Sequence, residues 1–437
     1  MILHREVRQQ NREWYAFEAP SWFAYDKVAR RYEALLGSVD WTAVREIDEQ
    51  GVRVGRLPHP ARAYIGSYLV MVEEKIESMP KLRAYLCEHP ALVWVLDYRL
   101  VADAERPEGF AVERSVPSAG HLGVKLGQLD AGQLASILQQ SAQQVLKEDR
   151  QSCRTLVMDV KHQYAYVRQN NLRHAWPERF NPGQQPRGDP DCRLGFKPCS
   201  NQGQDSTDTP THDKGSYLWG YGSGIAVVRT SNREAVVVAE TTRPFNVNDV
   251  EYAPALLQTT RHVLQGLPDA LIADAAFDAQ AVYAHFVGSA TTLAIPLNLR
   301  GKPAFQVTAE GVVWCPDDHT PLQALERWHD RGQLRQRFRC PHCARQHTLC
   351  ISPANLYRWQ IQHDGPTFRR LYRQRTIVER VNSLADAYKL TRPRQRRFRT
   401  VARRNTLIYI VLNYHVLLRL RRHHQDCVET SVHSPPA

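Results

Sequence analysis

The order of strand-like and helix-like segments most constrains what this chain can fold into. Beyond residue 154, five short segments rich in Val, Ile and Thr have the composition of β-strands. They span residues 155–160, 224–230, 235–241, 270–274 and 292–297. Two segments of helical character, 248–264 and 278–287, separate the third strand from the fourth and the fourth from the fifth. Three strands followed by alternating helix and strand predict an α/β fold with a mixed sheet.

This order is that of a ribonuclease-H-like core, and the rest of the chain divides around it. Residues 1–150 are mostly helical in pattern, with helices expected at 61–79, at 82–87 and after a capping Asp130. The core divides into 151–300, interrupted by a predicted loop at 176–216, and 351–422, which follows a cysteine-rich insertion at 301–350. Residues 423–437 lack periodicity and are predicted to be a disordered tail.

Three carboxylates far apart in the sequence are the candidate catalytic residues. Asp159 and Asp274 come near the ends of the first and fourth predicted strands, which are neighbours in such a core. Glu379 lies on a predicted helix that places Tyr372, Arg375, Glu379 and Asp386 on one face. Three such carboxylates can hold two Mg²⁺ or Mn²⁺ ions, which activate an attacking water or 3′-hydroxyl and stabilise the leaving oxygen. Alternatively, the aspartates are turn residues and Glu379 pairs with a neighbouring arginine.

A dense basic segment surrounds Glu379. Residues 369–404 contain thirteen Lys and Arg, twelve of them Arg, against two acidic residues, so +11 of the chain's net charge of +12 lies there. Arg binds phosphate oxygens in a forked geometry, and charge this concentrated repels itself without a polyanion. Together with the carboxylates, the segment predicts an enzyme that cuts DNA. The alternative is a solvated basic helix.

The cysteines predict a second metal site. Cys340-Pro-His-Cys343 has a spacing at which both thiolates reach one ion. The expected ligands of a structural Zn²⁺ are Cys315, Cys340, Cys343 and Cys350, with His319 as the main substitute. The alternative is that these are small buried residues. A weaker candidate site combines Cys192 and Cys199 with His174 and His212.

Cysteine usage and hydropathy also bound the location of the protein. Nine cysteines, an odd number with four between 315 and 350, fit a reducing compartment. Charge interrupts the first residues, unlike a signal peptide, and the longest apolar run, 406–420, is too short to span a bilayer. We expect a soluble, cytoplasmic protein that has no membrane partner.

Several stretches resemble the DDE transposases of bacterial insertion sequences, over roughly residues 150–420. The similar stretches are 214–228, 245–249, 272–278 and 375–383. One branch of that family carries the signature Y-x2-R-x3-E-x6-K, which Tyr372, Arg375 and Glu379 match. Its fourth position falls on Asp386 instead of lysine, and the role of that lysine is expected to pass to Lys389 or Arg380.

The resemblance implies that Asp159, Asp274 and Glu379 bind the catalytic metal ions. It implies DNA partners, the terminal inverted repeats and the target, bound by a homodimer on paired ends in the bacterial nucleoid. The residues expected to contact DNA are Tyr372, Arg375, Arg380, Lys389, Arg394, Arg396 and Arg397. Residues 1–150 are expected to read the transposon end or to mediate dimerisation. Two other functions stay open: a transposase-derived DNA-binding regulator, and a metal-dependent nuclease of the same fold.

Overall fold

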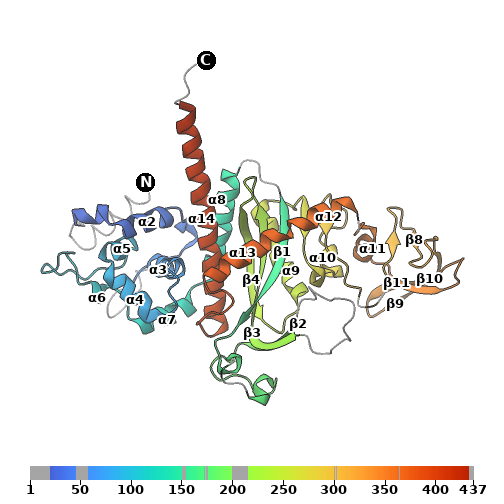
Figure 1. Ribbon diagram of the computed structural model, residues 1–437, viewed down its shortest axis with the longest axis horizontal. Coiled ribbons are helices and arrows are strands. Elements are labelled where there is room, and N and C mark those ends of the chain that lie inside the picture. Colours follow the sequence, from blue (N-terminus) through green and yellow to red (C-terminus); the bar gives the residue numbers. More distant parts are fainter. Residues whose placement is uncertain are drawn as a thin grey trace.

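A six-stranded mixed sheet lies at the centre of the molecule (Figure 1). The computed structural model describes residues 20–45, 58–149, 154–198 except 172, 174 and 175, and 215–432 except 300, 302 and 364. The strands are β1 (Thr155–Tyr164), β2 (Arg193–Pro198), β3 (Gly215–Arg229), β4 (Ala235–Pro244), β5 (Ala270–Ile272) and β6 (Thr292–Ala294). The order is β2-β3-β1-β5-β6, with β4 also on β3. Because β1 is antiparallel to β3 and parallel to β5, the mixed sheet predicted from the sequence is confirmed.

Strand β3 is the longest of the sheet and pairs with three others. Its first residues pair with β2 and its later ones with β4, while β1 pairs along residues 220–228. Tyr252, at the end of η6 (Asp249–Tyr252), packs against this strand. A Cβ atom at Gly224 would lie 2.5 Å from the Tyr252 ring, so only glycine lets the ring approach so closely.

The strand predictions were wrong at three places: β3 begins at Gly215 and not at residue 224, β2 was missed, and β1 is longer than predicted. Strand β2 lies inside the segment predicted as a loop, since its short, Gly- and Pro-containing sequence carries little strand signal and its backbone partners come from β3. Strand β1 continues to Tyr164, although the sequence predicted an end at 160. The polar residues Lys161, His162 and Gln163 interrupt the apolar run, but their backbone still pairs with β3.

Helices alternate with the parallel strands. The predicted helix at 248–264 is present as η6 followed by α9 (Ala253–Leu264). The next one is shorter than predicted: after η7 (Ala275–Phe277), α10 covers only Gln280–Tyr283 and gives way to turns. Asp278 does not begin the helix because its carboxylate accepts hydrogen bonds from the backbone N–H of Asn298 and from Arg358.

The N-terminal helices pack together beside the sheet (Figure 1). They are η1 (Ser21–Tyr25), α2 (Lys27–Leu36), η2 (Trp41–Ala43), α3 (Ala61–Glu73), α4 (Met79–Glu88), α5 (Pro90–Val95), α6 (Val112–Ser115), α7 (Ala119–Gln128) and α8 (Ala131–Glu148). Asp130 caps α8, as predicted, by accepting a hydrogen bond from the Gln133 N–H at 2.8 Å. The predicted helix at 61–79 ends earlier, at Glu73.

The long helix α14 (Phe398–Val432) joins these helices to the sheet. It packs against α8, α3 and β4, and one hydrophobic core extends from the N-terminal helices through the sheet to Leu420. Asn413, fully buried in its apolar run, bonds both the N–H and the carbonyl of Val237 on β4 and donates to Ser141 on α8. A polar residue here ties three elements together without leaving its amide unsatisfied.

Helix α14 corrects the prediction of a disordered tail at 423–437. Residues 423–432 continue the helix, and residues 433–437 lie outside the described part of the chain. No Gly or Pro interrupts the sequence before Pro435, so the helix propagates past its last buried turn. None of the described helices is both long and apolar enough to cross a membrane.

The cysteine-rich segment forms small sheets with a hydrophobic cluster of their own, beyond the central sheet (Figure 1). Their strands are β7 (Gln306–Val307), β8 (Val313–Trp314), β9 (Gln323–Asp330), β10 (Gln333–Arg339) and β11 (Gln346–Cys350). The chain returns through α11 (Pro353–Gln360), α12 (Pro366–Tyr372), η8 (Arg373–Arg375) and α13 (Thr376–Ala387). The helix predicted to carry Tyr372 and Glu379 on one face is therefore interrupted at η8.

Candidate active site

Asp159 and Asp274 lie at the same level on neighbouring parallel strands. Val157 of β1 is in register with Ile272 of β5, and each aspartate follows two residues later. Asp159 lies in the middle of β1, not near its end as predicted, because that strand continues to Tyr164. Asp274 follows β5 and caps η7 by accepting a hydrogen bond from the Ala276 N–H at 3.0 Å. The parallel pairing thus brings together two carboxylates more than a hundred residues apart.

Arg375 joins these aspartates to Glu379. Its guanidinium lies 3.4 Å from Asp159 Oδ1, 3.9 Å from Asp274 Oδ2 and 3.0 Å from Glu379 Oε1. Glu379 stands one helical turn beyond Arg375, so the two side chains meet along α13. The three candidate acids, called the acid cluster below, therefore surround one positive charge.

The acid cluster is partly shielded from solvent. Burial raises the pKa of Asp159 to about 6, against the opposing effect of Arg375, and Asp274 adds to the rise. Burial also raises the pKa of Asp274, again opposed by Arg375. Glu379 is the most open of the three, with 56% of its side chain exposed. Carboxylate oxygens are the ligands that divalent ions such as Mg²⁺ prefer, so the acid cluster is a candidate cation site.

Asn382 is a neighbour of the acid cluster that the sequence did not single out. Its amide donates to Asp159 Oδ2 at 2.8 Å from one turn beyond Glu379. The side chain is 5% exposed, and its amide oxygen has no hydrogen-bond partner among the described residues. This contact fixes one oxygen of Asp159 and leaves the other facing Arg375. Its position three residues after Glu379, on the same side of a helix, was the sequence feature that could have identified it.

Asp386 occupies the position at which the family branch carries a lysine. Its carboxylate pairs with Lys161 of β1. Asp386 Oδ2 lies 2.9 Å from Lys161 Nζ, and Asp386 Oδ1 accepts a hydrogen bond from the Thr391 N–H at 3.2 Å. Lys161 follows Asp159 by two residues on β1, so both side chains point to the same face. Lys389, expected to serve in place of the missing lysine, is exposed just after α13, at a φ of 61°. Because the sequence predicted that β1 ends at residue 160, Lys161 was not recognised as a neighbour of Asp159.

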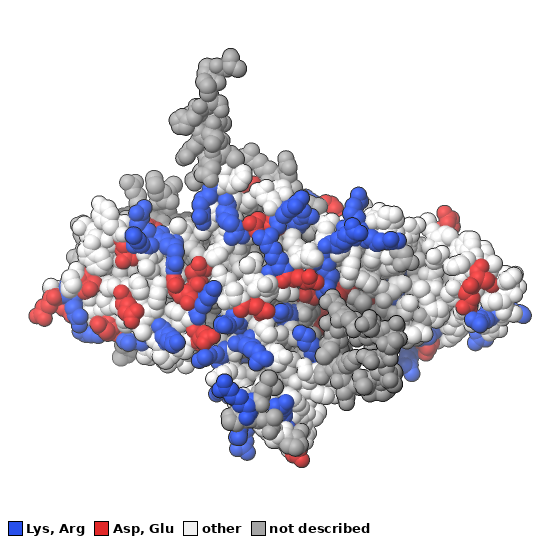
Figure 2. All heavy atoms as spheres, viewed as in Figure 1, with Lys and Arg blue, Asp and Glu red and all other residues white. Residues whose placement is uncertain are grey.

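The other predicted DNA-contacting residues are spread over several surfaces. Arg380 lies 3.9 Å from Glu234, and Arg394 lies 3.0 Å from Glu77. Arg396 donates to the Tyr166 carbonyl and lies over the Tyr166 ring, while Tyr372 stacks on Phe368. On the face shown in Figure 2, Lys and Arg side chains are concentrated across the middle, above and below a short band of acidic side chains. The predicted residues thus do not form one patch.

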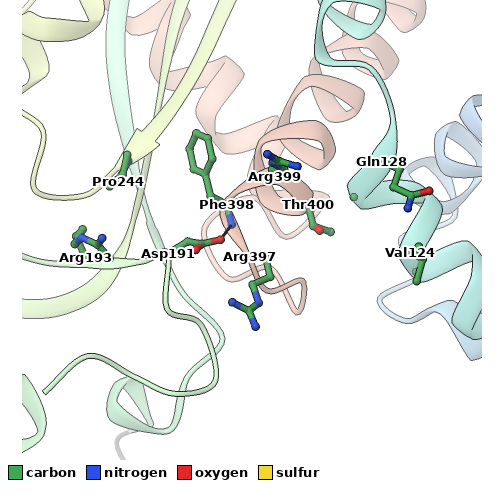
Figure 3. A pocket seen from close by; sticks show the side chains of 11 residues that line it. Val124, Gln128, Asp191, Arg193, Pro244, Arg397, Phe398, Arg399 and Thr400 are labelled. Carbon is green, nitrogen blue, oxygen red and sulfur yellow. Dashed lines mark hydrogen bonds between the residues drawn. The ribbon is translucent and has the colours of Figure 1, made fainter.

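Arg397 lines a groove of about 640 Å³ between the N-terminal helices and the core (Figure 3). The groove lies between α7, the loop before β2 and the first turn of α14, and Arg193 and Arg399 line it as well. Asp191 caps that turn by accepting a hydrogen bond from the Phe398 N–H at 3.0 Å. Three arginines facing one groove form a basic surface at the junction of the two parts of the molecule.

The cysteine-rich segment brings three of the four predicted zinc ligands together. Cys315, Cys340, Cys343 and Asp318, called the cysteine cluster below, have ligand atoms that all lie within 4.8 Å of one another. Cys350 is outside this group, with its thiol 3.5 Å from Ser352 Oγ, and so is His319. Of the weaker second site, Cys192 is buried and its thiol donates to the Asp189 carbonyl. Cys199, His174 and His212 lie outside the described residues.

Comparison with models of known families matches the chain from before β3 into α14. The model of a family described as "Transposase DDE domain" matches residues 199–414. The match includes Asp274, Glu379 and the cysteine-rich segment, and begins after β1, which carries Asp159. No curated protein and no solved structure matched the chain.

Proposed function

We propose, from the premise that the chain carries a transposase DDE domain, that it is an active transposase of an insertion sequence. In this proposal the protein binds the ends of the element, cleaves a phosphodiester bond and joins the freed 3′-hydroxyl to target DNA. The observation that carries the proposal is the contact of one guanidinium, that of Arg375, with carboxylates from β1, from the end of β5 and from α13. Such an arrangement requires the whole core to be folded.

Asp159, Asp274 and Glu379 are the residues that would hold Mg²⁺ or Mn²⁺. When bound, the ions supply activation of the attacking oxygen and stabilisation of the leaving oxygen. Asn382 orients Asp159 by holding one of its carboxylate oxygens. Arg375 offsets one of the three negative charges of the acids and, at 25% exposure, can also reach a phosphate oxygen of the DNA backbone.

Lys161 is the basic residue best placed to hold DNA beside the acid cluster. It shares a face of β1 with Asp159 and is fixed by Asp386 on the helix that carries Glu379. DNA farther from the site would be held by Arg397 in the arginine-lined groove and by Arg380, Lys389, Arg394 and Arg396, which contact different elements. These residues would contact the phosphates and sugars of the DNA. Such contacts position DNA without reading its sequence.

The same proposal covers partners and assembly. Reading of the terminal repeats is assigned to the helices at residues 20–148, which contact the core directly through α8 and also through α14. Joining two ends in concert requires two acid clusters, so the proposed active form is a homodimer on paired ends, in the nucleoid of the cytoplasm. The second candidate, a DNA-binding regulator without catalysis, would not need three acids around one site.

Strand transfer from a labelled donor end tests the function. The wild-type protein should give joined product in Mg²⁺ or Mn²⁺, and Asp159→Asn, Asp274→Asn and Glu379→Gln should each reduce cleavage by more than about 1,000-fold, since each removes a metal ligand. DNA binding in a gel-shift assay should be nearly unchanged, and Glu326→Gln, at an exposed acid on β9 outside the helices proposed to read the ends, is the matched control. Nicked DNA without joined product would identify a nuclease, and binding without either product would identify a regulator.

A further inference from the structure

Two turns of the cysteine-rich segment repeat one backbone design. The first is Cys315-Pro-Asp-Asp-His-Thr320 and the second is Cys340-Pro-His-Cys-Ala-Arg345. In each, the N–H of the first cysteine donates to the carbonyl five residues later, at 2.8 Å to Thr320 and 2.9 Å to Arg345. The fifth residue of each has a positive φ, 53° at His319 and 59° at Ala344. A residue with a Cβ adopts that conformation uncommonly, so its recurrence at equivalent positions marks the same turn twice.

The equivalence of the turns pairs Cys315 with Cys340 and Asp318 with Cys343. The second turn is a C-x2-C knuckle, the spacing at which two thiolates reach one zinc ion. The first is the same knuckle with Asp318 in the place of the second cysteine. The turns lie in the β8–β9 and β10–β11 connections, whose strands hold them face to face. We propose that Cys315, Asp318, Cys340 and Cys343 bind one structural Zn²⁺.

The distance between two of the thiols fits a tetrahedral zinc ion. Two thiolates at about 2.3 Å from a tetrahedral zinc lie about 3.8 Å apart. Cys315 Sγ lies 3.8 Å from Cys343 Sγ, and Cys340 Sγ lies 3.1 Å from Asp318 Oδ2. The Cys343 N–H also donates to Cys340 Sγ at 3.3 Å, which stabilises a thiolate at that position. Three thiolates select zinc over magnesium or calcium, and four protein ligands leave no open position for catalysis.

Two other residues compete for the fourth position. Cys350 is the ligand expected from composition, but it ends β11 and its thiol faces Ser352. His347 Nε2 lies 3.9 Å from Cys315 Sγ, yet it groups only with Cys315 and Asp317. Asp318 alone among the three lies within reach of all the other ligands.

The ion would hold together a segment with a small core. The hydrophobic cluster here is formed by a few side chains such as Val313, Phe338 and Leu349, and Trp359 of α11 joins it. A structural zinc ion contributes folding free energy where apolar burial is limited. Because α11 leads into α12 and α13, zinc also fixes the base of the segment that carries Glu379.

Metal analysis of the full-length, untagged protein tests this ligand set independently of transposase activity. Wild-type protein should contain one zinc per chain, and Asp318→Ala should lower zinc affinity by more than about 100-fold in competition with a chromophoric chelator, since losing even an outer contact costs 10- to 100-fold. Asp318→Cys, which completes the second C-x2-C knuckle, should retain the zinc. Cys350→Ser and His347→Gln should bind zinc as the wild type does.

Cobalt substitution provides a readout that does not depend on zinc loading alone. Co²⁺ in the wild-type protein should give thiolate-to-cobalt charge-transfer absorption, and Asp318→Cys should increase that absorption by about one-third, as three thiolates become four. Zinc-free wild-type protein would overturn the proposal. So would loss of zinc from Cys350→Ser or His347→Gln, or unchanged zinc affinity in Asp318→Ala.

Discussion

The acid cluster and the cysteine cluster are assembled in opposite ways. The acids come from β1, the end of β5 and α13, and meet only when the sheet has formed and α13 has packed beside it. The cysteine cluster comes from two turns that repeat one local design and needs only the small sheet between them. The first site depends on the global fold and the second on local backbone geometry. Perturbations of the large core should therefore separate the two.

The ion pair between Asp278 and Arg358 offers the largest expected effect for testing whether the two clusters are independent. Asp278 is fully buried, follows η7, and accepts hydrogen bonds from Arg358 of α11 and from Tyr283. Asp278→Ala would leave the guanidinium buried and unpaired, so we expect a loss of about 3–5 kcal/mol in the free energy of unfolding, measured with denaturant. Zinc content of the folded protein should not change, since the knuckles lie elsewhere.

An exposed ion pair provides the control for Asp278. Arg335 and Asp330 pair at 3.1 Å on the small sheet with both side chains about 40% exposed. Asp330→Ala should cost less than about 1 kcal/mol, because solvent screens such pairs. Equal losses in the two variants, or zinc release from folded Asp278→Ala protein, would remove the distinction between the two regions.

Glu240 adds a pH dependence to the core that holds the acid cluster. It pairs across the sheet with Ile225, which pairs with Asp159, and its carboxylate accepts hydrogen bonds from Thr242 and Thr406. Burial raises the pKa of Glu240 from its usual 4.5 to about 7, against the lowering effect of these hydrogen bonds. The folded state therefore favours the protonated form, and stability present below pH 4.5 is lost as the pH rises through about 7.

Glu240→Gln should remove this dependence. Between pH 4.5 and 8 the wild-type protein should lose at most about 3 kcal/mol that the glutamine variant keeps, measured by urea unfolding at each pH. If the free energy of unfolding changes with pH in the same way in the wild-type protein and in Glu240→Gln, burial does not raise the pKa of Glu240 and the prediction is wrong. Zinc affinity of the two proteins should be equal at pH 8, because no ligand of the cysteine cluster contacts Glu240.

Lys161 should have the smallest effect, confined to DNA binding. Lys161→Met should reduce the slope of log affinity against log salt by about 0.9, the value for one phosphate contact, with no change in zinc content. Lys389→Met is the matched comparison, since it changes the lysine nearest to the signature position. A reduced slope in Lys389→Met and an unchanged slope in Lys161→Met would assign the contact to Lys389.

The sequence predicted the parts of this molecule that have a local or periodic signal. Five strand segments, the Asp130 cap and the mixed sheet followed from apolar runs and their order, and the three acids were predicted from expected strand ends and a helix face. The sequence could not predict β2 or the end of β1, because long-range pairing with β3 outweighs weak local propensity there. For the same reason Lys161 was missed as a neighbour of Asp159, whereas Asn382 was missed because the packing of α13 against β1 has no local signal.

The zinc ligands illustrate a different limit of sequence reasoning. Counting cysteines favoured Cys350, while the repeated turn favours Asp318, and the two turns are recognisable as equivalents only from their hydrogen bonds and backbone angles. The C-P-x-D and C-P-x-C spacings were nevertheless present in the sequence. An alignment of these two short segments could therefore have identified Asp318 as the fourth ligand, whereas a count of cysteines could not.

Asp159, Asp274 and Glu379 come from distant segments, and we propose that they form one divalent-cation site. Mn²⁺ binding to zinc-loaded protein, followed by electron paramagnetic resonance, tests it without DNA or turnover. Wild-type protein and the Glu326→Gln control should bind Mn²⁺ alike, while Asp159→Asn, Asp274→Asn and Glu379→Gln should each weaken binding by more than about tenfold, because all three contribute ligands to the proposed site. Wild-type affinity in any of the three acid variants would contradict the account.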